Sequence, residues 1–164
     1  MEGFGKYKGE GDASSPENYQ LKWHKFLIYF GLWFIACSRA GTALMCMQGT
    51  VDLYSNQPEL VYAQYSGLRT VIVARGIVLL AVVAYMIYVR FQLSGLRTGA
   101  PRKLSILFIA NIAINLLYLL AVTVITDMTL TSLMGEITGT LFINIIMLFV
   151  NQNYYSKRLE LFVN

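Results

Sequence analysis

Long apolar runs separated by short polar segments make up the chain beyond its first 25 residues. Four of them are long enough, or nearly so, to cross about 30 Å of hydrocarbon as helices. These runs cover residues 26–49, 70–91, 104–126 and 134–151, the last being the shortest. Little amphipathic surface remains to face water, which disfavours a soluble helical bundle. We therefore predict an all-α membrane protein, a bundle of four transmembrane helices within residues 16–164.

The composition supports this class. The chain has 164 residues, of which 56% are hydrophobic and 13% are charged, whereas a soluble domain carries roughly twice that charged fraction. The net charge of +4 is compatible with binding to nucleic acid. However, the basic residues form short clusters between apolar runs, without any nucleic-acid-binding signature beside them. We expect no nucleic acid partner, and expect the lipid bilayer to surround the chain.

The basic residues fall on one side of this four-span arrangement, the side that is expected to face the cytoplasm. They lie before the first run, from the inner end of the second run to the start of the third, and after the fourth. These ten residues are Lys6, Lys8, Lys22, Lys25, Arg90, Arg97, Arg102, Lys103, Lys157 and Arg158. The other two connections hold the acidic residues Asp52, Glu59 and Asp127, with Arg69 at the end of the first. Both termini are therefore predicted to be cytoplasmic.

The segments outside the runs also have readable patterns. Residues 1–15 are rich in glycine, serine and charge, which predicts a disordered polar tail. Residues 58–65 are expected to form a short interfacial helix, and residues 153–164 to lie along the inner membrane surface. His24 stands alone before the first run, so we assign it an interfacial hydrogen-bonding role rather than a catalytic one.

Besides Arg90, which lies at the inner end of the second run, three charged residues fall inside the apolar runs, where each costs at least a few kcal/mol at the bilayer centre. In the predicted topology Arg39 lies about 20 Å from the cytoplasmic start of its span, and Arg75 roughly 7 to 8 Å from the outer boundary. Glu136 opens the fourth span on the same outer side. All three therefore belong to the outer half of the membrane.

Polar residues also recur with helical spacing in the last two spans. In the fourth, Glu136, Thr140, Asn144 and Asn151 share one face, and in the third Asn111, Asn115 and Tyr118 share another. Amides that faced lipid would leave hydrogen-bonding groups unsatisfied. Both stripes should therefore face the interior of the bundle and each other, with Asn115 and Asn144 near mid-membrane.

Two interpretations compete for these residues. In the structural one, Asn115 and Asn144 fix the register of the helices, Glu136 neutralises Arg39 or Arg75, and Arg75 extends towards the outer headgroups. In the functional one, the two arginines exceed the single glutamate and form a net-positive site open to the outside. Such a site would suit an anionic solute or a lipid headgroup, above a polar path lined by the asparagines.

Small residues suggest where helix backbones approach closely. Gly135 and Gly139 have the GxxxG spacing at the outer end of the fourth span, and Ala36, Ala40 and Gly41 give the first span a small-residue face. Either surface can pack within the chain or against a second copy, so a homo-oligomer is one possible assembly.

Four stretches carry a family resemblance: "LKWHKFLIYF" at 21–30, "PELVYAQYSGLR" at 58–69, "YVRFQLSGLRTGAPRKLSILFIAN" at 88–111 and "NYYSKRLELFVN" at 153–164. Together they resemble small four-span membrane proteins of Gram-positive gut bacteria, a family without a known activity. Some of its members carry a cysteine-paired zinc-ribbon module before the first span, but residues 1–25 contain no cysteine. The resemblance implies a bacterial cytoplasmic membrane location and no cofactor.

Sequence patterns for chemistry are missing. The chain has no phosphate loop, nucleotide fingerprint, zinc-protease signature or nucleophile elbow. One histidine and the distant pair Cys37 and Cys46 make no familiar metal site or disulfide. We predict no catalytic residue, metal or cofactor. The sequence instead favours a small helical-bundle accessory or interaction protein, with a channel or transporter using Arg39, Arg75 and Glu136 as the alternative.

Overall fold

The computed structural model describes residues 21–49, 58–127, 130–159 and 162, with the side chains of residue 58 and residues 130–137 excepted. In these ranges the chain forms helices and turns, and no strand. The prediction of an all-α fold is therefore confirmed for the described part of the chain. The tail predicted at residues 1–15 lies outside it.

The first long helix is continuous but changes its winding. It comprises α2 (Lys22–Phe26), the π-helical turn η1 (Leu27–Gly31) and α3 (Leu32–Gln48). It ends at Gly49, whose φ of 72° is a left-handed conformation that glycine adopts at little cost. The apolar run from residue 26 onwards predicted this long helix. Nothing in the sequence pattern predicted the π turn within it.

Four further helices follow in the described residues. They are α4 (Pro58–Gln64), α5 (Leu68–Ser94), α6 (Ala100–Thr126) and α7 (Leu130–Ser156). The short α4 agrees with the helix predicted at residues 58–65. The long helices extend beyond the predicted spans, because the polar residues that flank each apolar run continue the same helix.

Three helices have the length and apolar composition needed to cross a membrane: Lys22–Gln48, Leu68–Ser94 and Ala100–Thr126. These apolar helices are typical of a membrane protein. The run predicted as a fourth span lies within α7, which is also 27 residues long.

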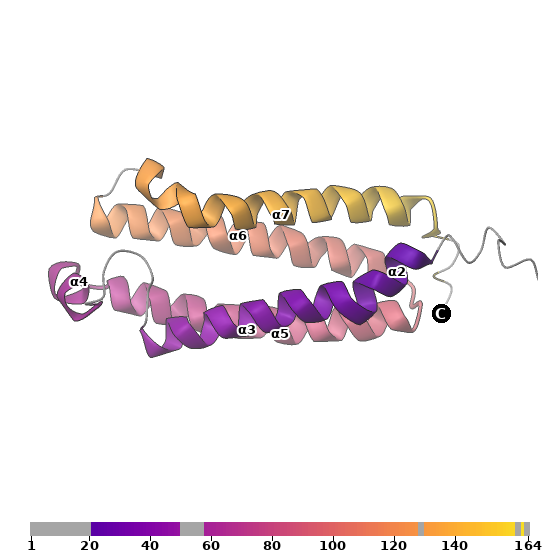
Figure 1. Cartoon of the computed structure of the whole chain (residues 1–164), viewed down its shortest axis with the longest axis horizontal. Coiled ribbons are helices and arrows are strands. Elements are labelled where there is room, and N and C mark those ends of the chain that lie inside the picture. The colour runs from indigo at the N-terminus through magenta and orange to yellow at the C-terminus, as the bar shows by residue number, and fades with distance from the viewer. Residues whose placement is uncertain (1–20, 50–57, 128–129, 160–161, 163–164) are drawn as a thin grey trace, which may run out of the picture.

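The long helices pack as neighbours in chain order. Helix α3 packs against α5, α5 against α6, and α6 against α7. Figure 1 shows α3 and α5 as one pair and α6 and α7 as the other, with α2 bending towards the end of α7. The first and last long helices therefore approach each other at the end where α2 lies.

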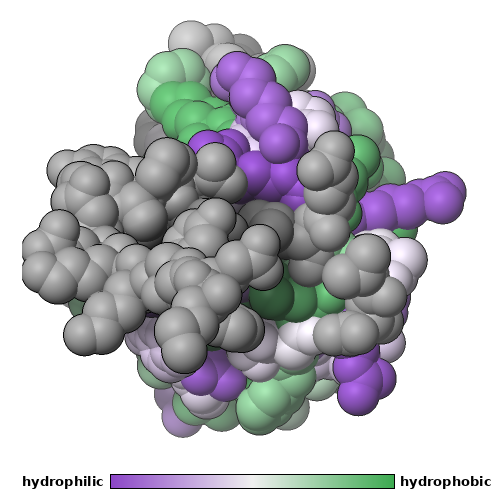
Figure 2. Space-filling view, turned by 90° about the vertical axis from the view of Figure 1, so that its right-hand side faces the viewer, coloured by the Kyte–Doolittle hydropathy of each residue, from purple (hydrophilic) through white to green (hydrophobic). Residues whose placement is uncertain are grey.

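That end carries most of the exposed positive charge. Lys22, Lys25, Arg97, Arg102 and Lys157 are exposed at the start of α2, around the α5–α6 turn and after α7. Figure 2 views this end and shows hydrophilic residues standing out among hydrophobic ones. The exposed acidic residues of the described chain, Glu59 and Asp127, belong to the opposite end.

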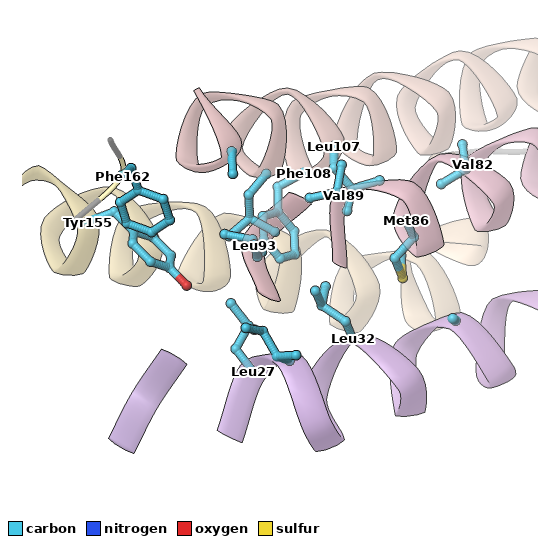
Figure 3. Close-up of a cluster of buried hydrophobic side chains, with 14 residues drawn as sticks. Leu27, Leu32, Val82, Met86, Val89, Leu93, Leu107, Phe108, Tyr155 and Phe162 are labelled. Carbon is cyan, nitrogen blue, oxygen red and sulfur yellow. The ribbon is translucent and has the colours of Figure 1, made fainter. Parts of the chain in front are cut away.

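Buried apolar side chains form two clusters along the bundle. The larger lies towards the α2 end and joins all four long helices (Figure 3); it includes Leu27, Met86, Phe108 and Tyr155. The smaller lies towards α4 and contains Cys46, Ile72, Tyr118 and Val122 among others. The polar side chains considered below lie between and beside these two clusters.

Of the C-terminal segment predicted to lie along the inner membrane surface, the structure describes residues 153–159 and 162, and that placement stays a prediction. Phe162 is buried, and its ring packs edge-on against His24 and Tyr155 (Figure 3). The Thr98 hydroxyl donates to the Phe162 carbonyl over 3.3 Å. An aromatic ring gains more from burial among other rings than from a surface position, so Phe162 inserts into the end of the bundle.

Candidate functional site

A close approach of α3 and α5 brings Arg39 and Arg75 together. Gly76 follows Arg75, and a Cβ at Gly76 would lie only 2.9 Å from the Ala43 carbonyl oxygen and 3.1 Å from the Cys46 Cβ. Only glycine allows two helix backbones to pack this tightly. Arg39 precedes Ala43 by one turn on α3, so the two arginines lie on neighbouring helices beside this contact.

The two guanidinium groups are both half-buried, and their positive charges repel each other. No acidic side chain among those the structure describes is paired with either of them. The prediction placed Glu136 against one of these arginines. The backbone of Glu136 belongs to α7, but its side chain lies outside the described residues, as do the surroundings of Gly135.

Arg75 turns towards α6. Its Nη2 donates to the Asn115 Oδ1 over 3.4 Å, and its guanidinium carbon lies 3.8 Å from the centre of the Tyr118 ring. Its Nε is buried and has no hydrogen-bond partner. These contacts hold the Arg75 side chain against α6. The interpretation of Arg75 as a residue that extends to the outer headgroups did not anticipate them, and it stays a prediction.

The predicted asparagine stripes face the interior. Asn111, Asn115, Asn144 and Asn151 are all buried. Each Nδ2 donates to the carbonyl four residues earlier in its own helix, over 2.6 to 3.0 Å. Asn115 also accepts a hydrogen bond from Arg75 of α5, whereas no hydrogen bond joins Asn115 to Asn144. The Asn111 Oδ1, also buried, has no partner.

A second polar cluster at the α2 end was missed from the sequence. The His24 Nδ1 lies 2.9 Å from the Tyr155 hydroxyl, and the Trp23 Nε1 donates to the Asn151 Oδ1 over 3.1 Å. The backbone of Leu93 also hydrogen-bonds the histidine ring. Burial raises the pKa of Tyr155, so its hydroxyl remains protonated and can donate to a neutral His24. His24 forms hydrogen bonds as predicted, but its side chain is buried, and its position at the membrane interface stays a prediction.

The π turn η1 forms a hydrogen bond near the same polar cluster at the α2 end. The Arg90 Nε of α5 donates to the Ile28 carbonyl oxygen over 3.0 Å, and its guanidinium lies over the Trp33 ring at 4.8 Å. A π turn carries one extra residue and exposes carbonyls that an α-helix would use internally. The run of aromatic residues around it, Phe26 to Phe34, gives no sequence signal for that extra residue.

The described side chains offer little for catalysis or metal binding. No group of three metal-ligating residues occurs among them, and both cysteines are free. His24 is surrounded by aromatic rings, and the hollow between Leu96, Arg158 and Phe162 has no room for a water molecule. The arrangement that can act on a ligand is the cationic pair Arg39 and Arg75.

Comparison with protein-family models, curated proteins and solved structures finds no match to this chain.

Proposed function

We propose that this chain is a four-span protein of the bacterial cytoplasmic membrane, with both termini in the cytoplasm, that acts as an accessory or interaction protein. The three apolar helices support membrane insertion, and α7 supplies the fourth span. The exposed basic residues around the α2 end support its cytoplasmic orientation, because positive residues are retained on that side. The family resemblance supports the bacterial membrane.

One observation carries the accessory role: the polar groups inside the bundle serve packing. The four buried asparagines donate to their own helices, and Phe162, Tyr155 and His24 fill the α2 end. A conduit needs polar groups that face a continuous wet path. In the described interior, one apolar cluster lies on the α2 side of Asn111 and Asn115 and the other lies on the α4 side. Such an interior suits a bundle that binds another protein rather than one that conducts a solute.

The orientation can be tested with single cysteines. Both native cysteines are replaced (Cys37→Ser, Cys46→Ala), and a cysteine is introduced at exposed Gln64 or exposed Arg97. A membrane-impermeant maleimide should label position 64 in intact cells and position 97 only after permeabilisation. Labelling of position 97 in intact cells would reverse the proposed orientation.

The accessory role is tested by combining flux with stability. Arg39→Gln and Asn144→Leu are each reconstituted into liposomes and also melted in detergent. An accessory bundle should lose thermal stability in these variants and show no ion or solute flux even in the native sequence. A flux that both folded variants abolish would contradict this role.

A small channel or transporter is the second candidate. It is favoured by the two neighbouring guanidinium groups with no described acidic partner, and by the unpartnered Arg75 Nε. In this case Arg39, Arg75 and Glu136 would form an outward-facing site for an anionic substrate. The liposome measurement separates it from the accessory role.

A second copy is a candidate partner through the small residues of α7 or α3. A Cβ added at Gly139 or Gly41 meets nothing within 4 Å, so neither glycine is used for close packing inside the chain. Both remain open to a neighbour in the bilayer. Gly139→Ile should reduce a dimer population in cross-linking experiments, and an unchanged population would remove α7 from the interface.

A further inference from the structure

We propose that Arg39 and Arg75 form a binding site for a phosphate group, carried either by a lipid headgroup or by a soluble phosphate. This inference deepens the proposed function and rests on its orientation, which places both arginines in the outer half of the membrane. It names the chemistry of a ligand that the bundle would hold.

The positive charges of Arg39 and Arg75 repel each other across the α3–α5 interface. Two guanidinium groups that repel each other at half-buried positions are unfavourable in a low-dielectric environment. The fold does not relieve this repulsion, because Gly76 fixes α3 against α5 beside them. An anion between the two groups would convert the repulsion into two attractions.

Arg39 and Arg75 carry N–H groups that have no hydrogen-bond acceptor among the described residues. A guanidinium offers five N–H groups. Arg75 uses Nη2 for a long bond of 3.4 Å to Asn115, and its buried Nε bonds to nothing. Arg39 has no hydrogen bond or ion pair within the described part of the chain. The pair therefore has more donors than the surrounding protein uses.

The two guanidinium groups also restrict the shape of the ligand. Planar guanidinium forks bind phosphate and carboxylate oxygens in pairs. Two arginines suit a phosphate, because it offers more acceptor oxygens and more negative charge than one carboxylate. The Tyr118 ring, 3.8 Å from the Arg75 guanidinium, holds one face of that group and leaves its edge for the ligand.

A ligand can reach the two arginines from outside the bundle. Both arginines are only half-buried, so the site is not sealed within the protein. In the proposed topology they lie roughly 7 to 10 Å below the outer boundary, a depth that lipid headgroups reach where arginine draws them locally inwards. The same opening would admit a soluble phosphate from the outside.

The test uses the purified full chain in neutral detergent. One arm measures the unfolding temperature against inorganic phosphate, with chloride at equal ionic strength as the reference. The other counts bound phosphatidic acid and phosphatidylcholine by native mass spectrometry. Stabilisation by inorganic phosphate identifies a soluble ligand, and retention of phosphatidic acid alone identifies a lipid headgroup.

Arg39→Gln and Arg75→Gln should each weaken binding about tenfold or more, because each removes a charge-assisted contact. Arg69→Gln is the matched control. It removes one positive charge from an exposed position of α5, the helix that carries Arg75, at the end that the proposed topology places outside. Arg39→Lys keeps the positive charge but loses the planar guanidinium that binds two oxygens at once, so it should bind phosphate severalfold more weakly. This variant replaces Arg39→Gln in the test if the glutamine variant fails to fold.

Three results would overturn the proposal. They are no binding of either probe by the native sequence, equal binding by the arginine variants, and an equal loss in Arg69→Gln. None of these results depends on the labelling of positions 64 and 97. A failure of the phosphate site is therefore distinct from a failure of the proposed topology.

Discussion

Gly76 permits a contact between helix backbones that any side chain would prevent. The position of a Cβ there is 2.9 Å from the Ala43 carbonyl oxygen and 3.0 Å from the Met47 Cγ. Because the nearest atom belongs to the backbone, it cannot turn away as a flexible side chain would. Gly139 lies in a similar apolar helix but has open space around it.

The same substitution should therefore have opposite effects at these two glycines. Gly76→Ala should lower the free energy of unfolding by about 1–3 kcal/mol through overpacking. Gly139→Ala should leave it unchanged or raise it by up to about 1 kcal/mol, since alanine favours the helix. Thermal unfolding of both variants in one detergent compares them directly. Equal effects would mean that the α3–α5 contact is not tight.

Asn111 and Asn115 differ in how completely their oxygens are satisfied. Both are buried and both donate to their own helix, but only the Asn115 Oδ1 accepts a hydrogen bond, from Arg75. The Asn111 Oδ1 accepts none. A buried polar atom without a partner costs free energy, whereas an apolar group of similar shape in its place does not.

Replacement by leucine should separate the two residues. Asn111→Leu should be neutral or stabilise the bundle by up to about 2 kcal/mol. Asn115→Leu should destabilise it by about 1–3 kcal/mol, because the Arg75 guanidinium loses its amide acceptor. Chemical denaturation in mixed micelles provides the comparison. Destabilisation by Asn111→Leu would point to a water or ligand on its oxygen.

The π turn sets the orientation of the first helix. Five residues, Leu27–Gly31, are wound more widely than the α-helix on either side. One extra residue turns α2 by about 100° relative to α3. This rotation directs Trp23 and His24 towards α7, where they bond Asn151 and Tyr155.

Deletion of Tyr29, an exposed residue of this turn, should restore an α-helix and rotate Trp23 and His24 away from α7. We expect a lower unfolding temperature, comparable to that of the double variant Trp23→Phe/His24→Phe. Combining the deletion with the double variant should add little, since both remove the same contacts. A fully additive loss would show that the turn has another role.

The helices were predictable from the sequence because apolar length alone identifies them. The short helix at residues 58–64 was also predictable, from the proline that begins it and the tyrosines Tyr62 and Tyr65. The π turn was not, because one inserted residue leaves an aromatic-rich run equally apolar. Burial of the asparagine stripes followed from helical spacing, but their bonding did not, since an amide can bind its own backbone as readily as a neighbouring helix.

The candidate site was predicted in part. Depth arithmetic placed Arg39 and Arg75 at similar heights, and the packing of α3 on α5 brings them together. The contacts of Arg75 with α6 were missed, because only the packed structure shows the Tyr118 ring beside it. The glycine that fixes this contact carries a weak sequence signal, because it is a single glycine within "ARGIV" and has no second glycine at the GxxxG spacing.

The two ends of the bundle are built differently. At the α2 end, Phe162, His24 and Tyr155 form a packed aromatic group joined by hydrogen bonds. Towards the other end lie the unpartnered Arg75 Nε and the repelling arginines. Stability should therefore be concentrated at the α2 end, and ligand binding near the other.

Phe162→Ala should reveal this concentration. Removing a buried ring from a packed group costs about 3–5 kcal/mol, so the variant should melt well below the native protein. Phe149→Ala removes an equal ring from a position that is 66% exposed and should have a small effect in detergent. Similar melting of the two variants would contradict the burial of Phe162.

The position of Phe162 along the chain also orders the assembly of the bundle in time. Neighbouring helices in the chain are neighbours in space, so α3 with α5, and α6 with α7, can pair as each leaves the ribosome. The contact between Phe162 and His24 spans almost the entire sequence and must wait until residue 162 has been synthesised. The bonds from Trp23 to Asn151 and from His24 to Tyr155 also need the end of α7, so the first helix can close on the last only when almost the whole chain has been made. In the proposed accessory role, this order gives a membrane partner a period in which to engage the open bundle.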